Sequence, residues 1–144
     1  MEKTDLHTLI RIRKWDVDEK QRSLAVLLRQ EESVMDRQAA LEAEIKREMA
    51  FTAEAPTEQR FTLSAYLKRC EGYREQLGAI LQEIRRRVAE AQEELAEAFR
   101  QLKPIEETQK MRDAEDEKEA NRLEQEDLDE IGLNLHRRRE QHIF

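Results

Sequence analysis

A heptad repeat of apolar residues runs along the first part of the chain and resumes after a proline. In the first series, steps of four and three residues land on Leu6, Ile10, Val17, Leu24, Leu27, Val34, Leu41 and Ile45, with Arg13, Lys20, Glu31 and Gln38 at the places between them. The second series lands on Tyr66, Cys70, Tyr73, Leu77, Ile80 and Ile84 and, after a four-residue stutter, on Val88, Ala91, Leu95, Ala98, Leu102 and Ile105. This spacing keeps apolar side chains on one stripe of a helix, as in a coiled-coil seam.

The composition favours long helices. Charged residues make up 41% of the 144 residues, and the chain has only three glycines and two prolines to form turns. A disordered chain of similar charge would lack the sustained apolar period. We therefore predict an all-α fold, a long antiparallel two-helix coiled-coil hairpin with an extended C-terminal helical overhang, in one elongated domain over residues 1–144.

Proline positions set the expected boundaries. Pro56 disfavours helical geometry at the residue before it, so a first helix over about residues 6–50 should end in a hairpin tip over about residues 51–62. A second helix is expected over about residues 63–140, with Pro104 as its candidate kink. At ~1.5 Å per residue, the first helix would be roughly 65–70 Å long.

An antiparallel hairpin predicts that facing residues have numbers with a constant sum. Ile10 with Leu102 and Val17 with Leu95 both give 112, twice the number of Pro56. Towards the tip the same sum selects Leu28 and Met35, one residue beyond the strict series, which predicts a slight drift of the stripe. A shift by one heptad also matches apolar to apolar, so the agreement with the turn is what favours this register.

This register leaves residues 107–144 without a partner inside the chain. Residues 106–122 are mostly charged, and apolar residues return at Leu123, Leu128, Ile131, Leu133 and Leu135. One interpretation is a tail that folds back into a three-helix bundle. The alternative, which we favour, is a terminal amphipathic element that binds a partner. Arg137, Arg138 and Arg139 follow, where cations suit either binding or the C-terminus of a helix.

Composition and motifs argue against several classes of function. A net charge of −7 disfavours nucleic acid as the main partner. Cys70 is the only cysteine, which favours a reducing compartment, and neither a signal peptide nor a membrane span is recognisable, so a cytoplasmic protein is expected. No catalytic constellation, phosphate loop or metal-ligand spacing stands out, so we expect no enzymatic activity, cofactor or metal.

Two further groups of residues have open interpretations. Trp15 lies off the seam and either contacts a partner or covers the flank of the seam. Arg85, Arg86 and Arg87 spread around about 200° of a helix, which favours a solvated face over a single binding patch.

The two ends of the chain resemble the FliJ family, small soluble proteins of the bacterial flagellar type III export apparatus. The likeness is carried by LHTLIRIRKWDVDEKQRSLAVLL at Leu6–Leu28 and EQEDLDEIGLNLHRRR at Glu124–Arg139, together with the length and the hairpin between them. The family is similar in shape to the antiparallel coiled coil of the rotary ATP synthase gamma subunit.

The resemblance implies a non-enzymatic coupling stalk that acts in flagellum biogenesis and motility. Such a stalk binds the hexameric export ATPase (FliI-like), promotes assembly of its ring, links the ring to the membrane export gate protein (FlhA-like) and serves as a chaperone escort. It would be a monomer outside the complex and would associate peripherally with the membrane apparatus. The residues that the resemblance assigns to the gate are Tyr66, Cys70, Tyr73 and Leu77. Those that it assigns to the ATPase include Leu128, Asp129, Glu130 and Ile131, and Leu135 extends the same helical stripe.

The gate assignment conflicts with the second seam series, which contains the same four residues, so seam and partner surface both stay open for residues 66–77. Two other functions also stay open. One is the equivalent stalk of a virulence-type injectisome, and the other is a generic coiled-coil scaffold, which would self-associate.

Overall fold

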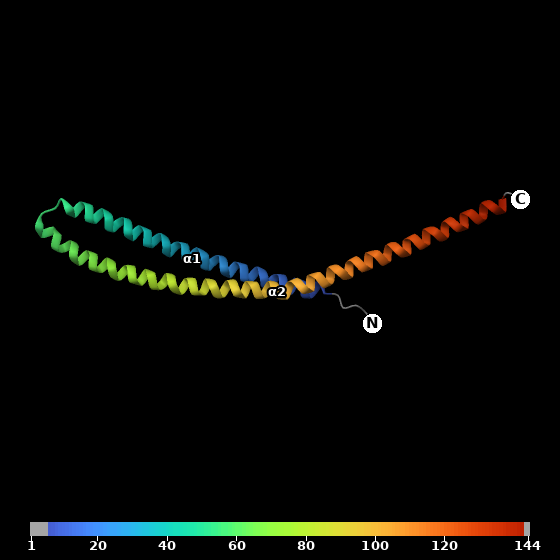
Figure 1. Ribbon diagram of the computed structural model, residues 1–144, viewed down its shortest axis with the longest axis horizontal. Coiled ribbons are helices and arrows are strands. Elements are labelled where there is room, and N and C mark those ends of the chain that lie inside the picture. The colour runs from blue at the N-terminus through green and yellow to red at the C-terminus, as the bar shows by residue number, and fades with distance from the viewer. Residues whose placement is uncertain (1–5, 143–144) are drawn as a thin grey trace. The chain divides into compact units, whose positions relative to one another are not determined.

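The computed structural model describes residues 6–142, which form two long helices packed against each other. Helix α1 spans His7–Ala53 and helix α2 spans Thr57–His142 (Figure 1). The structure is 97% helical, and the described residues contain no strand. The predicted all-α hairpin is therefore confirmed.

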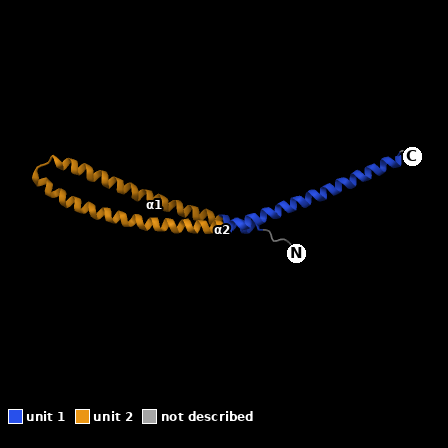
Figure 2. Ribbon diagram, viewed as in Figure 1, with its two compact units in different colours: residues 1–14, 100–144 blue, residues 15–99 orange. Residues whose placement is uncertain are grey.

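The chain divides into two compact units (Figure 2). One unit contains residues 15–99, which comprise most of α1, the turn and the first half of α2. The other contains residues 1–14 and 100–144, and therefore the start of α1 and the second half of α2. Pro104 lies inside α2, which is helical on both sides of it. The Thr108 hydroxyl donates to the Pro104 carbonyl oxygen at 2.8 Å.

The turn between the helices is much shorter than predicted, because only Glu54, Ala55 and Pro56 lie outside the helices. The Ala55 amide donates to the Thr52 carbonyl at 3.0 Å, and the Gln59 amide donates to the Pro56 carbonyl at 3.0 Å. The prediction of a tip over residues 51–62 assumed that its threonines interrupt the helix. Only the proline breaks the helix, since it restricts the residue before it. No described residue has a positive φ, so this turn requires no glycine.

The seam of α1 follows the strict heptad of the sequence. Its apolar positions and the polar positions among them are all buried or half-buried over residues 6–45. The predicted drift of the stripe is wrong, because Leu28 and Met35 are exposed. Arg13 illustrates how a polar residue is accommodated. Its guanidinium donates to Gln101 Oε1 at 2.6 Å, although its Nε is buried without a partner.

The seam of α2 has no stutter, which corrects the second series. Tyr73 and Ile80, which were placed in the seam, are exposed, whereas Leu81 is buried. Steps of four and three from Cys70 pass through Arg74, and the heptad then runs unbroken to the end of the paired region. Its members after Arg74 are Leu77, Leu81, Ile84, Val88, Ala91, Leu95, Ala98, Leu102 and Ile105. The sequence analysis assigned this heptad position to Tyr73 because its neighbour Arg74 is charged, and it therefore needed a stutter further along the helix.

The register also differs from the prediction. Three pairs of buried residues have numbers that add to 115 rather than 112: Val17 with Ala98, Val34 with Leu81, and Ile45 with Cys70. Ion pairs between the helices agree with this sum. They join Lys20 to Glu94 at 3.6 Å, Glu31 to Arg85 at 3.9 Å, and Glu42 to Arg74 at 2.8 Å.

The new register places polar seam residues of α1 opposite leucine and isoleucine. By the sum of 115, Lys20 faces Leu95, Glu31 faces Ile84 and Gln38 faces Leu77. The register predicted from the sequence, which pairs apolar residues with apolar residues, would avoid these mixed pairs. Polar residues at seam positions reduce stability but select one register among several. The long side chains of Lys20 and Glu31 reach charged partners on α2, and this offsets part of that loss.

Candidate partner-binding surfaces

The four residues assigned to the gate do not share one surface. Cys70 is 4% exposed and Leu77 is half-buried, so both belong to the seam. Tyr73 is 57% exposed, and Tyr66 is half-buried on the same stripe one heptad earlier. Ile80 lies one heptad further and is exposed. The surface available to a partner is therefore Tyr66, Tyr73 and Ile80, and the sequence missed Ile80 because it was counted as seam.

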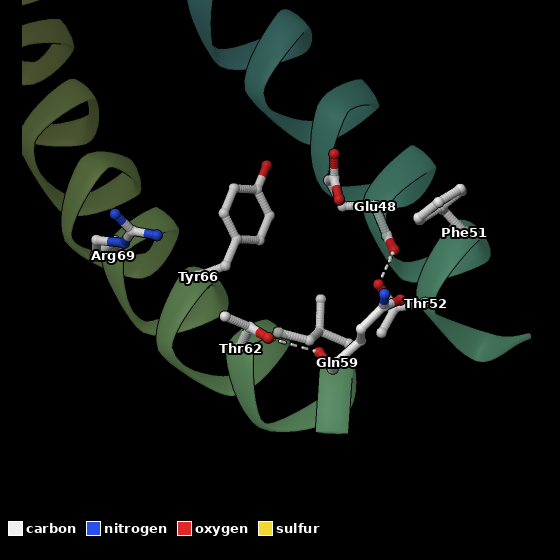
Figure 3. Close-up of a pocket in the computed structure, with 8 residues that line it drawn as sticks. Glu48, Phe51, Thr52, Gln59, Thr62, Tyr66 and Arg69 are labelled. Atoms are coloured by element: carbon white, nitrogen blue, oxygen red, sulfur yellow. Dashed lines mark hydrogen bonds between the residues drawn. The ribbon is translucent and has the colours of Figure 1, made fainter. Parts of the chain in front are cut away.

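A hollow of about 350 Å³ lies beside the turn, between the end of α1 and the start of α2. Figure 3 shows Tyr66 projecting from α2 into the space between the two helices. The lining residues come from both helices: Glu48, Phe51, Thr52, Gln59, Thr62, Leu63, Tyr66 and Arg69. We call these residues the tip hollow.

Local hydrogen bonds explain why the seam does not fill this hollow. Glu48 and Thr52 occupy the last two heptad places of α1. Thr52 is buried and its hydroxyl donates to the Glu48 carbonyl at 2.7 Å, while Glu48 itself is exposed. On α2, the Thr62 hydroxyl donates to the Gln59 carbonyl at 3.0 Å. Short side chains that bond to their own helix leave space between the helices.

The Tyr66 hydroxyl is the notable polar group of this region. It is buried and makes no hydrogen bond of standard geometry. Loss of solvent around this hydroxyl raises the pKa of Tyr66, and the neighbouring Cys70 and Glu44 raise it further. Tyr66 therefore stays neutral across the physiological range, with its hydroxyl close to Cys70 and Glu44.

Two phenylalanines beside the turn have the most exposed large apolar side chains among the described residues. Phe51 is 75% exposed at the end of α1, and Phe61 is 79% exposed at the start of α2. The sequence placed both in a loop and gave them no role. Their position near a helix end was the available signal, because large exposed aromatic side chains commonly mark interaction sites.

The residues assigned to the ATPase lie on an unpacked part of α2. Leu128, Ile131 and Leu135 are exposed, as are Asp129 and Glu130. Every described residue from 113 to 142 is exposed.

The apolar stripe of the tail is not a continuation of the seam. In the tail, steps of four and three from Ile105 reach Asp116, Glu119, Leu123, Glu126, Glu130 and Leu133, of which four are charged and all are exposed. Leu128, Ile131 and Leu135 have heptad spacing of their own but lie on a different face of the helix. This part of α2 therefore lacks a seam that could pair with another stretch like α1.

Charge is unevenly distributed along α2. Residues 106–130 contain 12 acidic and 4 basic residues, a net charge of −8 that exceeds the −7 of the whole chain. Arg122 bridges Glu119 and Glu126 on this stretch. Arg137, Arg138 and Arg139 form no ion pair within residues 6–142, so this cluster is available to an anionic partner.

The arginine run of the hairpin is used within the fold. Arg85 pairs with Glu31 of α1, Arg86 bridges Glu83 and Glu90, and Arg87 pairs with Glu83. The pKa of Glu83 is lowered to about 2, chiefly by its hydrogen bonds with Arg86. The run is therefore a set of ion pairs. Trp15 is 63% exposed, so it does not cover the seam and is accessible to a partner.

The described residues offer no evident centre for chemistry. No group of histidine, cysteine and acidic residues within residues 6–142 is arranged to hold a metal ion. His136 pairs with Glu140 at 3.1 Å on the surface of the tail. What the arrangement offers instead is exposed apolar and charged surface, at the tip and on the tail.

Neither helix, over the residues that the structure describes, has a segment long and apolar enough to cross a membrane.

Comparison with family models, with curated proteins and with solved structures finds no match to this chain. The resemblance to the FliJ family therefore rests on the terminal sequence motifs and on the hairpin between them.

Proposed function

We propose that this chain is a non-enzymatic coupling stalk of a flagellar type III export apparatus. It binds the export ATPase ring through its tail, promotes assembly of the ring and links it to the export gate through the region of the turn. The proposal rests on the terminal motifs that resemble the FliJ family. It places the protein in the cytoplasm, peripherally associated with the membrane apparatus, and includes escort of export chaperones.

The observation that carries the proposal is the contrast between a closed seam and an exposed tail. The hairpin buries its seam within one chain, so it needs no second copy to be stable. The tail exposes Leu128, Ile131 and Leu135 beside Asp129 and Glu130. Burying each apolar side chain contributes ~1.5–3 kcal/mol before ordering costs, so a partner that covers three of them gains several kcal/mol.

For the gate, the geometry favours Tyr66, Tyr73 and Ile80 over the four residues of the family pattern. Tyr73 and Ile80 are exposed one heptad apart beside the seam, and Tyr66, one heptad earlier, is half-buried with its hydroxyl between the helices. Cys70 and Leu77 would contact a partner only if the seam opened. A gate surface made of the flank leaves the hairpin closed on binding.

Removal of residues 124–144 tests the proposal. We expect the truncated chain to lose stimulation of the export ATPase ring and to keep the melting temperature of the hairpin, measured by circular dichroism. A matched variant, Leu133→Ala, leaves the stripe intact and should retain stimulation. Loss of the hairpin on truncation, or full stimulation without the tail, would contradict the proposal.

A further inference from the structure

One face of the tail combines apolar side chains with a cation. Leu128, Ile131 and Leu135 follow one another at steps of three and four residues and are 55%, 56% and 54% exposed. The next place in this series is Arg138, three residues after Leu135. The spacing is that of a coiled-coil seam, but the stripe is short and does not continue the seam of the hairpin. It therefore matches a short segment of the same kind and not a long helix such as α1.

Charge changes sign along the tail, on either side of Leu133. Residues 124–130 contain five acidic residues and no basic one, whereas residues 136–142 contain three arginines and one glutamate, a net charge of +2 with neutral histidines. The two segments are equally far from Leu133 along the chain. A second copy that runs in the opposite direction places each segment against its opposite, and a copy that runs in the same direction places like against like. The charge pattern therefore selects an antiparallel second copy.

One antiparallel register satisfies both the apolar stripe and the charges. Where the numbers of facing residues add to 266, Ile131 faces Leu135 of the other copy, and residues 124–130 face residues 142–136. A shift by one heptad, to a sum of 259, places residues 124–130 opposite residues 135–129, which contain two more acidic residues and no basic one. Of these two registers, only the first joins opposite charges.

The hairpin already contains the polar contact that this register requires. Lys20 occupies a seam place opposite a leucine of α2, and its ammonium lies 3.6 Å from a carboxylate oxygen of Glu94, the residue before that leucine. In the paired tails Arg138 faces Leu128, and the residue before that leucine is Asp127. Neither the Arg138 nor the Asp127 side chain forms an ion pair within residues 6–142, so both are available across the pair. By symmetry this contact occurs twice.

We propose that two copies of this chain pair in antiparallel orientation through residues 124–142. Ile131 packs against Leu135 of the other copy, and Arg138 pairs with Asp127 of the other copy. Each copy supplies only three large apolar side chains, so the contact is weak and forms as the concentration rises. This inference departs from the monomer that the resemblance to the FliJ family implies. It also covers the stripe that is proposed to bind the export ATPase, so pairing and ring binding exclude each other, and that consequence alone rests on the proposed function.

Sedimentation equilibrium of the full-length chain tests the pairing. The weight-average mass should rise from that of one chain towards that of two between about 5 and 500 µM, a range that covers weak interfaces. Added salt should weaken the pairing, because the charges lie at the surface. Ile131→Asp should abolish it, whereas Leu133→Asp, on the opposite face of the helix, should retain it.

An exchange of charges identifies the contact and its direction. Asp127→Arg and Arg138→Asp each place like charges together, so each variant alone should pair about tenfold more weakly or worse. A mixture of the two variants, or one chain with both substitutions, has opposite charges at both contacts and should recover the pairing. The matched controls Glu126→Arg and Arg137→Asp reverse charges away from the stripe and should pair nearly as the parent does.

Several results would overturn the inference. A monomer throughout the concentration range is one, and a dimer that survives Ile131→Asp is another, because its contact would lie elsewhere. Failure of the mixture to recover the pairing would overturn the antiparallel register. A monomeric chain whose tail binds vesicles containing phosphatidylglycerol would assign the stripe to an anionic membrane surface instead. No export component enters these measurements, so a chain that pairs but stimulates no export ATPase would contradict the proposed function alone.

Discussion

Helix α2 contains two regions with the same backbone and opposite surroundings. Up to Arg112 it packs along α1 through a continuous heptad, whereas every described residue from 113 to 142 is exposed. Both regions are rich in charge, so composition alone does not separate them. The difference is at the heptad positions, where leucine, valine and alanine of the paired region give way mainly to aspartate and glutamate in the tail, with Leu123 and Leu133 between them. A leucine at a heptad position is buried only where α1 lies opposite, because Leu123 and Leu133 are exposed.

The strongest test of the paired region is a disulfide across the seam. With Cys70 replaced by serine, cysteines at Val17 and Ala98 should form a bond within one chain and raise stability by about 4 kcal/mol, because the bond closes a long loop of the unfolded chain. Denaturant unfolding under oxidising and reducing conditions measures the difference. The pair Val17 and Leu95, which the sum of 112 would favour, serves as the control. Preferential crosslinking of that control, or bonds between chains only, would refute the register.

A charged residue should destabilise the protein when it is placed in the seam and have no effect on stability when it is placed in the tail. Val34→Asp buries a carboxylate at a position 5% exposed, and we expect it to destabilise the hairpin by about 3 kcal/mol. Ile131→Asp changes an exposed residue of the tail and should leave the melting temperature unchanged. Met35→Asp, beside Val34 but exposed, controls for the added charge on α1. Similar melting temperatures for Val34→Asp and Met35→Asp would contradict the seam.

Replacing a polar seam residue should stabilise the hairpin. Lys20→Leu adds apolar contact opposite Leu95, and the ion pair that it removes, with Glu94 at 3.6 Å, is solvent-exposed and contributes little. We expect a gain of about 1 kcal/mol in the free energy of unfolding, from the added apolar burial. Arg37→Leu, at an exposed and unpaired position of α1, is the control. A loss of stability in Lys20→Leu greater than in the control would show that Lys20 does not lie in the seam.

The smallest expected effect is on the acid side of the stability curve. Hydrogen bonds with Arg74 lower the pKa of Glu42, and those with Arg86 lower the pKa of Glu83 to about 2 from 4.5. Because the folded pKa is the lower one, the stabilisation is present above the unfolded pKa and is lost as pH falls from about 4.5 towards 2. Melting temperatures at pH 7 and pH 3 should therefore differ less in Glu42→Gln with Glu83→Gln than in the parent. Both carboxylates are exposed, so solvent screening keeps the change small.

The control for this prediction is Glu54→Gln, in the turn, which should leave the difference between the two melting temperatures as it is in the parent. An unchanged difference in the double variant would show that these ion pairs do not act in solution.

The sequence by itself determined the helices, the position of the turn and the seam of α1 with its polar members. These features follow from local properties: the restriction that Pro56 imposes on Ala55, and a heptad whose members share one face whatever lies opposite. It also marked the tail as lacking a partner, since the first helix is too short to reach residues 107–144 in the predicted register. Its resemblance to the FliJ family supplied the candidate residues of the tail, which the structure leaves exposed.

Only the tertiary structure decided the register, the seam of α2 and the surfaces near the turn. Two helices with heptad repeats can pair in several registers. Which register forms depends on how the side chains of both helices fill the space between them. In α2, the heptad passes through Arg74, which is exposed and pairs with Glu42 of α1, and not through its neighbour Tyr73. That outcome exposes Tyr73. The tip hollow has a similar origin, because Thr52 bonds to its own helix and leaves space that no periodicity in the sequence records.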